Sequence, residues 1–183
     1  MKGRTIWRSF SALLIGVTLG AADGASAQDR ASSPIDLARF YKGAWLEVAR
    51  RPMWITQGCV AGTTSYSRGA ASNEVLVRDA CHKGGLSGPE TVLSGVAEIL
   101  DPGVNSRLRV QYNPLLSVEY NIVERARDYS WFIEVSPTLD NLFIYTRKRP
   151  SRKQLDSLVA RARGLGYDTS TLEYPWEPRS NPE

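Results

Sequence analysis

The chain has 183 residues, of which 42% are hydrophobic and 23% charged, a balance typical of an ordinary globular protein of one domain. A single His and two Cys exclude a histidine-rich metal site and any centre held by four thiolates, so no metal and no cofactor are expected. The formal net charge of +4 is too small to indicate a nucleic-acid partner.

The first 27 residues have the three parts of a secretory signal peptide. A basic start (Lys2, Arg4, Arg8) precedes an apolar stretch over 10–22, and the small residues 25–27 end it. The apolar stretch is shorter than the about 20 residues that span a bilayer, although an uncleaved anchor helix is the alternative. We therefore expect cleavage after Ala27, a mature chain of net charge +2, and a periplasmic or secreted protein. No Cys is placed near the cleavage site for lipid attachment.

Both cysteines, Cys59 and Cys81, lie in the expected mature chain. In an oxidising compartment an even number of cysteines indicates a disulfide, which would stabilise the fold by roughly 3 kcal/mol on the chain-entropy model. The alternative is a reactive thiol assisted by His82, the only histidine. His82 could also be a haem ligand, but its glycine-rich surroundings fit an ordinary loop residue better.

Short strands separated by turn residues follow one another along the chain. Pro34 begins a helical turn over 35–40, and alternation around Trp45 indicates a first strand of about eight residues. The further strands are expected at 60–68, 74–81, 90–100, 106–113, 117–126, 129–135 and 142–147. Because no helical crossover separates them, the pattern predicts an all-β antiparallel meander over about 43–147, either a barrel or a sandwich.

One helix follows the strands, over about 151–164. Ser151 and Gln154 have the spacing of a capping box, and apolar residues recur at helical spacing from Leu155 to Leu165. The basic opposite face fits a solvated face on a helix docked to the strands. Residues 170–174 could add an edge strand, and the Pro-rich tail 175–183 is expected to be loose. Residues 28–183 thus form a single domain.

Catalytic motifs are missing from the sequence. No serine lies in a G-x-S-x-G elbow, and there is neither a G-x-G-x-x-G fingerprint nor a P-loop. Asp128 and Asp140 lie near turns, which explains them adequately. The residues therefore favour a binding protein without catalytic residues, and an eight-stranded barrel can be just wide enough to hold one small ligand.

Three ordered motifs resemble those of the lipocalins, most closely the bacterial outer-membrane lipocalin and apolipoprotein D branch. Gly43-Ala44-Trp45 is similar to the opening G-x-W motif, Arg127-Asp128-Tyr129 to the second motif, and Arg147 stands at the basic residue of the third. The first two motifs depart from the usual residues at Ala44, Leu46 and Arg127, and the lipid-attachment Cys of the anchored members is missing. The resemblance implies an eight-stranded antiparallel up-and-down barrel with one C-terminal α-helix packed outside.

The resemblance also implies a closed and an open end of the barrel. At the closed end Trp45 would pack beneath Arg147, a cation–π contact of about 0.5–2 kcal/mol, with Gly43, Asp128 and Tyr129 beside them. At the open end the first long loop, with Met53, Trp54 and Ile55, would form a lid. Packing of this loop inward over the mouth is expected, with peripheral contact with a membrane or a partner as the alternative.

The directions of the side chains along the strands predict a ligand cavity. If Trp45 points inward, alternation places Glu47 and Ala49 inward as well. Arg107, Arg109 and Gln111 form the opposite, solvent-facing side of their strand. The strand phases of the family imply that Val75 and Ala97 also face in, and that the remaining cavity residues are Thr64, Tyr66, Val77, Leu93, Leu108, Val110, Tyr112, Tyr120, Ile122, Phe143 and Tyr145.

This apolar and aromatic set predicts a small hydrophobic ligand, such as a fatty acid or a lysophospholipid, bound for transport, storage or scavenging. Two alternatives stay open. A lipid-modifying enzyme of this fold could use Glu47, because a carboxylate in an apolar barrel should have a raised pKa. A barrel filled by its own side chains would instead serve as a protein-interaction module. The oligomeric state is left open by the sequence.

Overall fold

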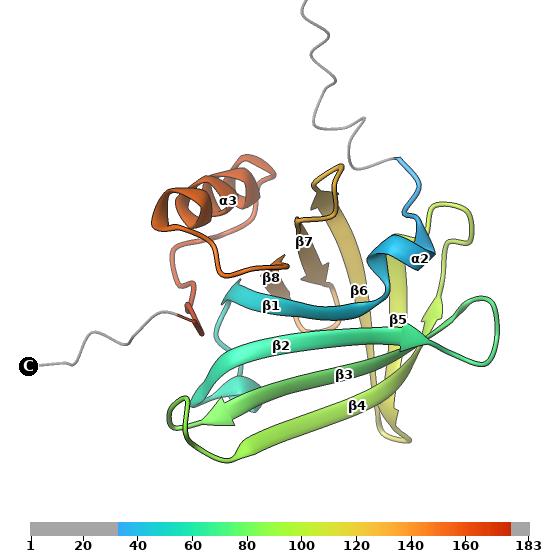
Figure 1. Ribbon diagram of the computed structural model, residues 1–183, viewed down its shortest axis with the longest axis horizontal. Coiled ribbons are helices and arrows are strands. Elements are labelled where there is room, and N and C mark those ends of the chain that lie inside the picture. The colour runs from blue at the N-terminus through green and yellow to red at the C-terminus, as the bar shows by residue number, and fades with distance from the viewer. Residues whose placement is uncertain (1–32, 177–183) are drawn as a thin grey trace, which may run out of the picture.

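Eight antiparallel strands close into a barrel in the computed structural model, which describes residues 33–176 (Figure 1). Each strand pairs with the next, and the last returns to the first. The up-and-down barrel is therefore confirmed and the sandwich is ruled out. The strands are β1 (Gly43–Arg50), β2 (Cys59–Arg68), β3 (Glu74–Lys83), β4 (Glu90–Ile99), β5 (Arg107–Asn113), β6 (Leu116–Arg125), β7 (Trp131–Ser136) and β8 (Asn141–Thr146).

Two further elements lie before β2. The short helix α2 (Leu37–Phe40) begins at Asp36, whose Oδ1 accepts hydrogen bonds from the backbone N–H groups of Ala38 and Arg39 at 2.9 and 3.2 Å. Its last residue, Phe40, is fully buried against the Trp45 and Phe132 rings. A 3₁₀ turn, η1 (Trp54–Thr56), lies in the loop between β1 and β2. The expected leader, residues 1–27, lies outside the described residues.

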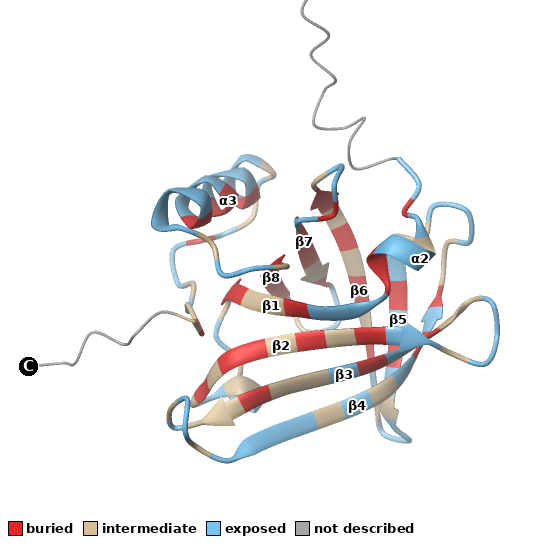
Figure 2. Cartoon of the chain, viewed as in Figure 1, coloured by how far each residue is buried: buried red, intermediate tan, exposed pale blue. Residues whose placement is uncertain are grey.

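The helix α3 (Arg152–Gly164) packs on the outside of the barrel, as expected. The predicted capping box is present: the Ser151 hydroxyl accepts from the Gln154 N–H, and the Gln154 side chain accepts from the Ser151 N–H. The apolar side of α3 is buried and faces β7, β8 and β1 (Figure 2). The core therefore has two parts: one lies inside the barrel, and the other lies between the barrel and α3. No helix among residues 33–176 is long and apolar enough to cross a bilayer.

A bulge in β1 changes which residues face the barrel interior. The register with β8 shifts between Glu47 and Ala49, so one residue of β1 is left over. Glu47 therefore faces in, Ala49 packs in the outer cluster beneath α3, and Arg50 turns toward the interior. The prediction that Ala49 lines the cavity is wrong, because alternation does not hold across a bulge.

The segment after α3 is held to β1 and β2. Only one isolated bridge, between Glu173 and Arg50, forms where an edge strand was expected over 170–174. The Pro175 carbonyl then accepts from the Ala61 N–H at 2.7 Å, and Trp176 Nε1 donates to the Gly62 carbonyl at 2.9 Å. The tail is thus docked rather than loose at its first two residues, because β2 offers backbone groups there; its remainder, 177–183, lies outside the described residues.

Candidate ligand-binding site

A cavity of about 490 Å³ lies inside the barrel toward its open end. This volume lies in the roughly 300–1,000 Å³ range of small-molecule sites, so the barrel is not filled by its own side chains. Residues of the β1–β2 loop, Leu116 and Leu139 line it toward the open end. Among the predicted cavity residues, those that line it are Glu47, Thr64, Tyr66, Val77, Leu93, Leu108, Val110, Tyr112, Tyr120, Phe143 and Tyr145.

Ile122 does not line this cavity, although it was expected to. Its side chain is buried in the inner cluster together with Val75 and Ala97. These three residues face into the barrel as alternation predicts, but they pack where the interior is filled. Ile122 therefore points into the barrel as predicted, but the prediction that it lines the cavity is wrong. Alternation along a strand gives the direction of a side chain and not its height in the barrel.

The closed end is built around Trp45 and Arg147. The guanidinium carbon lies 3.4 Å from the centroid of the fully buried indole ring, which is the contact that the resemblance implied. Arg147 Nη1 donates to the carbonyls of Lys42 and Ala44 at 2.8 and 3.0 Å, and Nη2 donates to that of Phe40 at 3.0 Å. These hydrogen bonds tie the end of β8 to the chain before β1.

The other predicted closed-end residues lie beside this contact. Gly43 has a φ of +63°, a conformation that favours glycine, next to the Arg147 guanidinium. The Asp128 carboxylate accepts from the N–H and hydroxyl of Ser130 at 3.0 and 2.7 Å, which lowers the pKa of Asp128. The Tyr129 hydroxyl accepts from the Asp36 N–H at 3.0 Å. None of these residues lines the cavity inside the barrel.

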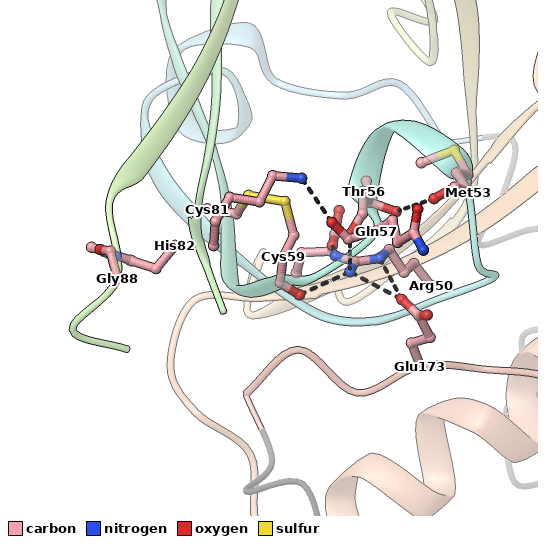
Figure 3. Close-up of a disulfide and its surroundings, with 11 residues drawn as sticks. Arg50, Met53, Thr56, Gln57, Cys59, Cys81, His82, Gly88 and Glu173 are labelled. Carbon is pink, nitrogen blue, oxygen red and sulfur yellow. Dashed lines mark hydrogen bonds and ion pairs between the residues drawn. A yellow bond between two sulfur atoms is a disulfide. The ribbon is translucent and has the colours of Figure 1, made fainter. Parts of the chain in front are cut away.

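A disulfide joins Cys59 at the start of β2 to Cys81 near the end of β3, with 5.4 Å between the two Cα atoms (Figure 3). The predicted pairing is confirmed, and the reactive-thiol alternative is wrong. His82 lies on β3 and not in a loop as expected, and its Nδ1 is 2.9 Å from the carbonyl of Gly88 in the β3–β4 loop. Among residues 33–176, no cluster of His, Cys, Asp and Glu is suited to hold a metal ion.

The lid residues all border the cavity but differ in direction. Met53 packs against the inner cluster. Trp54 is 85% exposed and Ile55 is partly exposed. Inward packing over the mouth is therefore wrong for Trp54, because the η1 turn directs its ring to solvent.

Comparison with known proteins agrees with this geometry. A family model described as a lipocalin-like domain matches residues 35–177. The chain belongs to the lipocalin family. It is 28% identical over 150 residues to a protein of Acanthamoeba polyphaga mimivirus named as a putative lipocalin, a match that covers 76% of this chain and 83% of that one.

Solved structures show the same fold at low sequence identity. Insecticyanin from the tobacco hornworm Manduca sexta has a TM-score of 0.60 and 15% identity, over 82% of this chain and 85% of that one. A lobster apocrustacyanin has a TM-score of 0.58 and 17% identity, over 76% and 79%. At such low identities these structures show only that this lipocalin shares their fold.

Three charged residues of the lipocalin cavity were missed by sequence reasoning: Arg50, Asp79 and Glu134. Asp79 has the same parity as Val75 and Val77, so strict alternation along β3 could have found it. Glu134 lies on β7, to which no facing was assigned. Arg50 gave no sequence signal, because the bulge alone turns it inward.

Glu134 is buried, Glu47 and Asp79 are partly buried in the cavity wall, and the loss of water around each carboxyl raises its pKa. Glu47 accepts a hydrogen bond from Arg50, which opposes the rise in the Glu47 pKa. Asp79 accepts from the hydroxyls of Thr64 and Tyr112, which likewise lower its pKa in part. For Glu134 the charges of Asp79 and Glu47 add to the effect of burial, so its pKa rises well above the ordinary value.

Arg50 connects the cavity wall to the segment after α3. Its side chain is only 2% exposed, and its Nε and Nη2 donate to Glu173 Oε2 at 3.2 and 3.0 Å. Nη2 also donates to the carbonyls of Thr56 and Cys59 at 3.3 and 3.1 Å, as the dashed lines in Figure 3 show. One guanidinium thus joins β1, the lid loop, β2 and the C-terminal segment beside the disulfide.

Proposed function

We propose that this lipocalin binds one small hydrophobic ligand in the barrel and carries, stores or scavenges it. The observation that carries the proposal is the cavity of about 490 Å³, closed toward Trp45 and walled largely by apolar and aromatic side chains. Burial of an alkyl chain contributes up to about 0.8 kcal/mol per CH₂ before ordering costs. A fatty acid or a lysophospholipid is the ligand that we propose from the sequence, its chain inside and its polar group toward the mouth.

Peripheral contact with a membrane would bring such a ligand to the mouth. Three loops at the open end carry exposed large apolar side chains: Trp54 is 85% exposed, Leu86 68% and Leu115 98%. Trp is favoured where one end of a side chain is apolar and the other wet, as at a lipid surface. These residues support peripheral contact as part of the proposal.

Export is the second part of the proposal. The disulfide between Cys59 and Cys81 is a feature of oxidising compartments, which supports a periplasmic or secreted protein. Cleavage after Ala27 and the bacterial, apolipoprotein D-like branch are proposed from the sequence. N-terminal sequencing of the exported protein should return Gln28; a sequence that starts at Met1 would contradict export by cleavage.

The site does not support the catalytic role suggested for Glu47. Glu47, the carboxylate suggested for lipid chemistry, is ion-paired with Arg50, which in turn is held by Glu173. A base that must move protons is better left free of such a partner. Carriage of a ligand is therefore the function we propose.

Filling the cavity tests the carrier proposal. Val110 lines the cavity on β5. The indole of Val110→Trp should therefore occupy the cavity and weaken binding of a fluorescent long-chain lipid. Overpacking should lower the free energy of unfolding by about 1–3 kcal/mol. The matched control is Arg109→Ala on the solvent side of the same strand, where Arg109 pairs with Glu119 at 2.7 Å. Its lipid affinity should match wild type. Lipid binding by neither wild type nor variants would contradict the proposal.

A further inference from the structure

Two carboxyl groups in the cavity wall form no ion pair within the described part of the chain. The wall carries Glu47, Asp79 and Glu134, and its cationic residue is Arg50. Arg50 is already shared between Glu47 and, from the C-terminal segment, Glu173. Within residues 33–176, no ion pair joins Asp79 or Glu134 to a cation. The interior therefore has more acidic groups than the hydrophobic ligand proposed above requires.

These two groups lie on opposite walls of the barrel. Asp79 is on β3 and Glu134 on β7, which are four strands apart in either direction around the closed sheet. Both border the same cavity. Since the charge of Asp79 contributes to the raised pKa of Glu134, the two groups interact across the interior. A cation bound in this cavity would be attracted by both carboxylates.

The immediate contacts of the two groups differ. Asp79 is held as an acceptor by the Thr64 hydroxyl and by the Tyr112 hydroxyl at 2.7 Å, which itself lies 3.1 Å from that of Tyr120.

Glu134 is only 3% exposed, its cross-strand neighbours are the apolar Phe143 and Ile122, and its Oε1 finds no hydrogen-bond donor in the described part of the chain. A buried acceptor without a donor is uncommon in native proteins, and one that borders a ligand cavity points to a donor on the ligand.

We propose that the preferred ligand is an amphiphile with a protonated primary amine, held between Glu134 and Asp79, with its alkyl chain against Val77, Leu108 and Val110. An ammonium group supplies three donors and one positive charge, so it can donate to the unsatisfied Glu134 Oε1 and offset the repulsion between Glu134 and Asp79. A fatty-acid carboxylate at this depth would add a further negative charge. The inference rests on the proposed function, which is binding of one hydrophobic ligand in the barrel, but it replaces the fatty acid named there with an amphiphilic amine.

The test compares ligands that share a chain and differ in the polar group. Dodecylamine, dodecanol and dodecanoate are each titrated against the full mature chain loaded with the neutral probe N-phenyl-1-naphthylamine. The titrations are made at neutral pH and below the micelle concentration of each ligand, and displacement of the probe gives the affinity. We expect dodecylamine to bind at least about tenfold more tightly than dodecanol, as charge-assisted hydrogen bonds allow, and dodecanoate to bind no more tightly than dodecanol.

Two cavity variants and one surface variant assign the preference to the site. Glu134→Gln should reduce the amine-to-alcohol affinity ratio to about threefold or less, because it removes the charge and keeps the shape; the ratio is taken within the one variant, so a change in affinity common to both ligands cancels. Asp79→Asn is a second, independent test if Glu134→Gln fails to fold. Glu98→Gln removes an equal charge from the exposed outer face of β4 and should keep the full ratio.

Each outcome decides one claim. If dodecanol displaces the probe but dodecylamine shows no preference, or if the preference survives both cavity variants, the amine inference is overturned and the carrier proposal stands. Loss of the preference in Glu98→Gln would assign it to the surface and also overturn the inference. If none of the three ligands displaces the probe, the carrier proposal itself fails, and the inference fails with it.

Discussion

At the scale of single residues, Arg147 shows how one side chain closes a barrel. Its guanidinium covers the Trp45 indole at 3.4 Å and donates to carbonyls of Lys42, Ala44 and Phe40. The planar, multiply donating group is required here, because a Lys ammonium could not cover the ring and reach several carbonyls together. The residue contributes to stability at one end while the ligand site lies at the other.

Arg147→Ala should therefore lower stability without changing ligand affinity. Loss of the cation–π contact and of the hydrogen bonds to the chain around β1 should cost about 1–3 kcal/mol of stability, which is several degrees in the melting midpoint of a domain of this size. Thermal unfolding and lipid titration measure the two effects. Lys148→Ala, at the exposed neighbouring position, is the control. A wild-type melting midpoint in Arg147→Ala would show that the closed-end contact is not structural.

At the scale of elements, the segment after α3 acts as a strap across β1 and β2. Glu173 pairs with Arg50 through both backbone and side chain, and the Pro175 carbonyl and Trp176 indole bond to β2 at Ala61 and Gly62. Because Arg50 also contacts the lid loop at the Thr56 carbonyl, the strap, the lid and the cavity wall share one buried guanidinium. A substitution that loosens the strap should therefore also loosen the lid loop at the mouth of the barrel.

Glu173→Ala should loosen this strap. Two charge-assisted hydrogen bonds to Arg50 are lost, which we expect to cost about 1–3 kcal/mol, since Glu173 itself is half-exposed. Hydrogen exchange should then speed up at the Ala61 and Glu173 amides, both of which are bonded across this contact. Thr171→Ala, on the exposed surface of the same segment, should leave exchange unchanged. Unaltered exchange in Glu173→Ala would mean that the backbone bonds hold the strap without the ion pair.

At the scale of the whole molecule, acidic groups inside the barrel couple its stability to pH. Burial raises the pKa of Glu47, Asp79 and Glu134 in the folded chain above their ordinary values. The ordinary pKa is 4.5 for Glu134. When the pH exceeds this value, a group with a raised pKa still holds its proton in the folded chain but has lost it in the unfolded chain. Stability from these groups is therefore full in acid and is lost as the pH rises through their folded pKa values.

The ligand-free lipocalin should accordingly melt at a lower temperature at pH about 8 than at pH about 5. Glu134→Gln should raise the melting midpoint at the higher pH and flatten the profile, because a neutral amide replaces the group that must otherwise lose a proton. Glu98→Gln, with its carboxylate in solvent, should follow wild type. A wild-type profile that is flat or that rises with pH would contradict the burial of ionisable groups inside the barrel.

The sequence by itself determined the antiparallel strands and the capping box of α3, because period-2 alternation, turn residues and capping residues are local properties; the choice of a barrel over a sandwich came from the resemblance to lipocalins. It also determined the Cys59–Cys81 pair, once export was inferred, and the facing of most cavity residues. Only the tertiary structure decided the bulge that turns Arg50 instead of Ala49 inward, the docking of Pro175 and Trp176, and the placement of Asp79 and Glu134 in one cavity. These features arise when the sheet closes and brings together residues that are distant along the chain, and no local pattern records where closure places them.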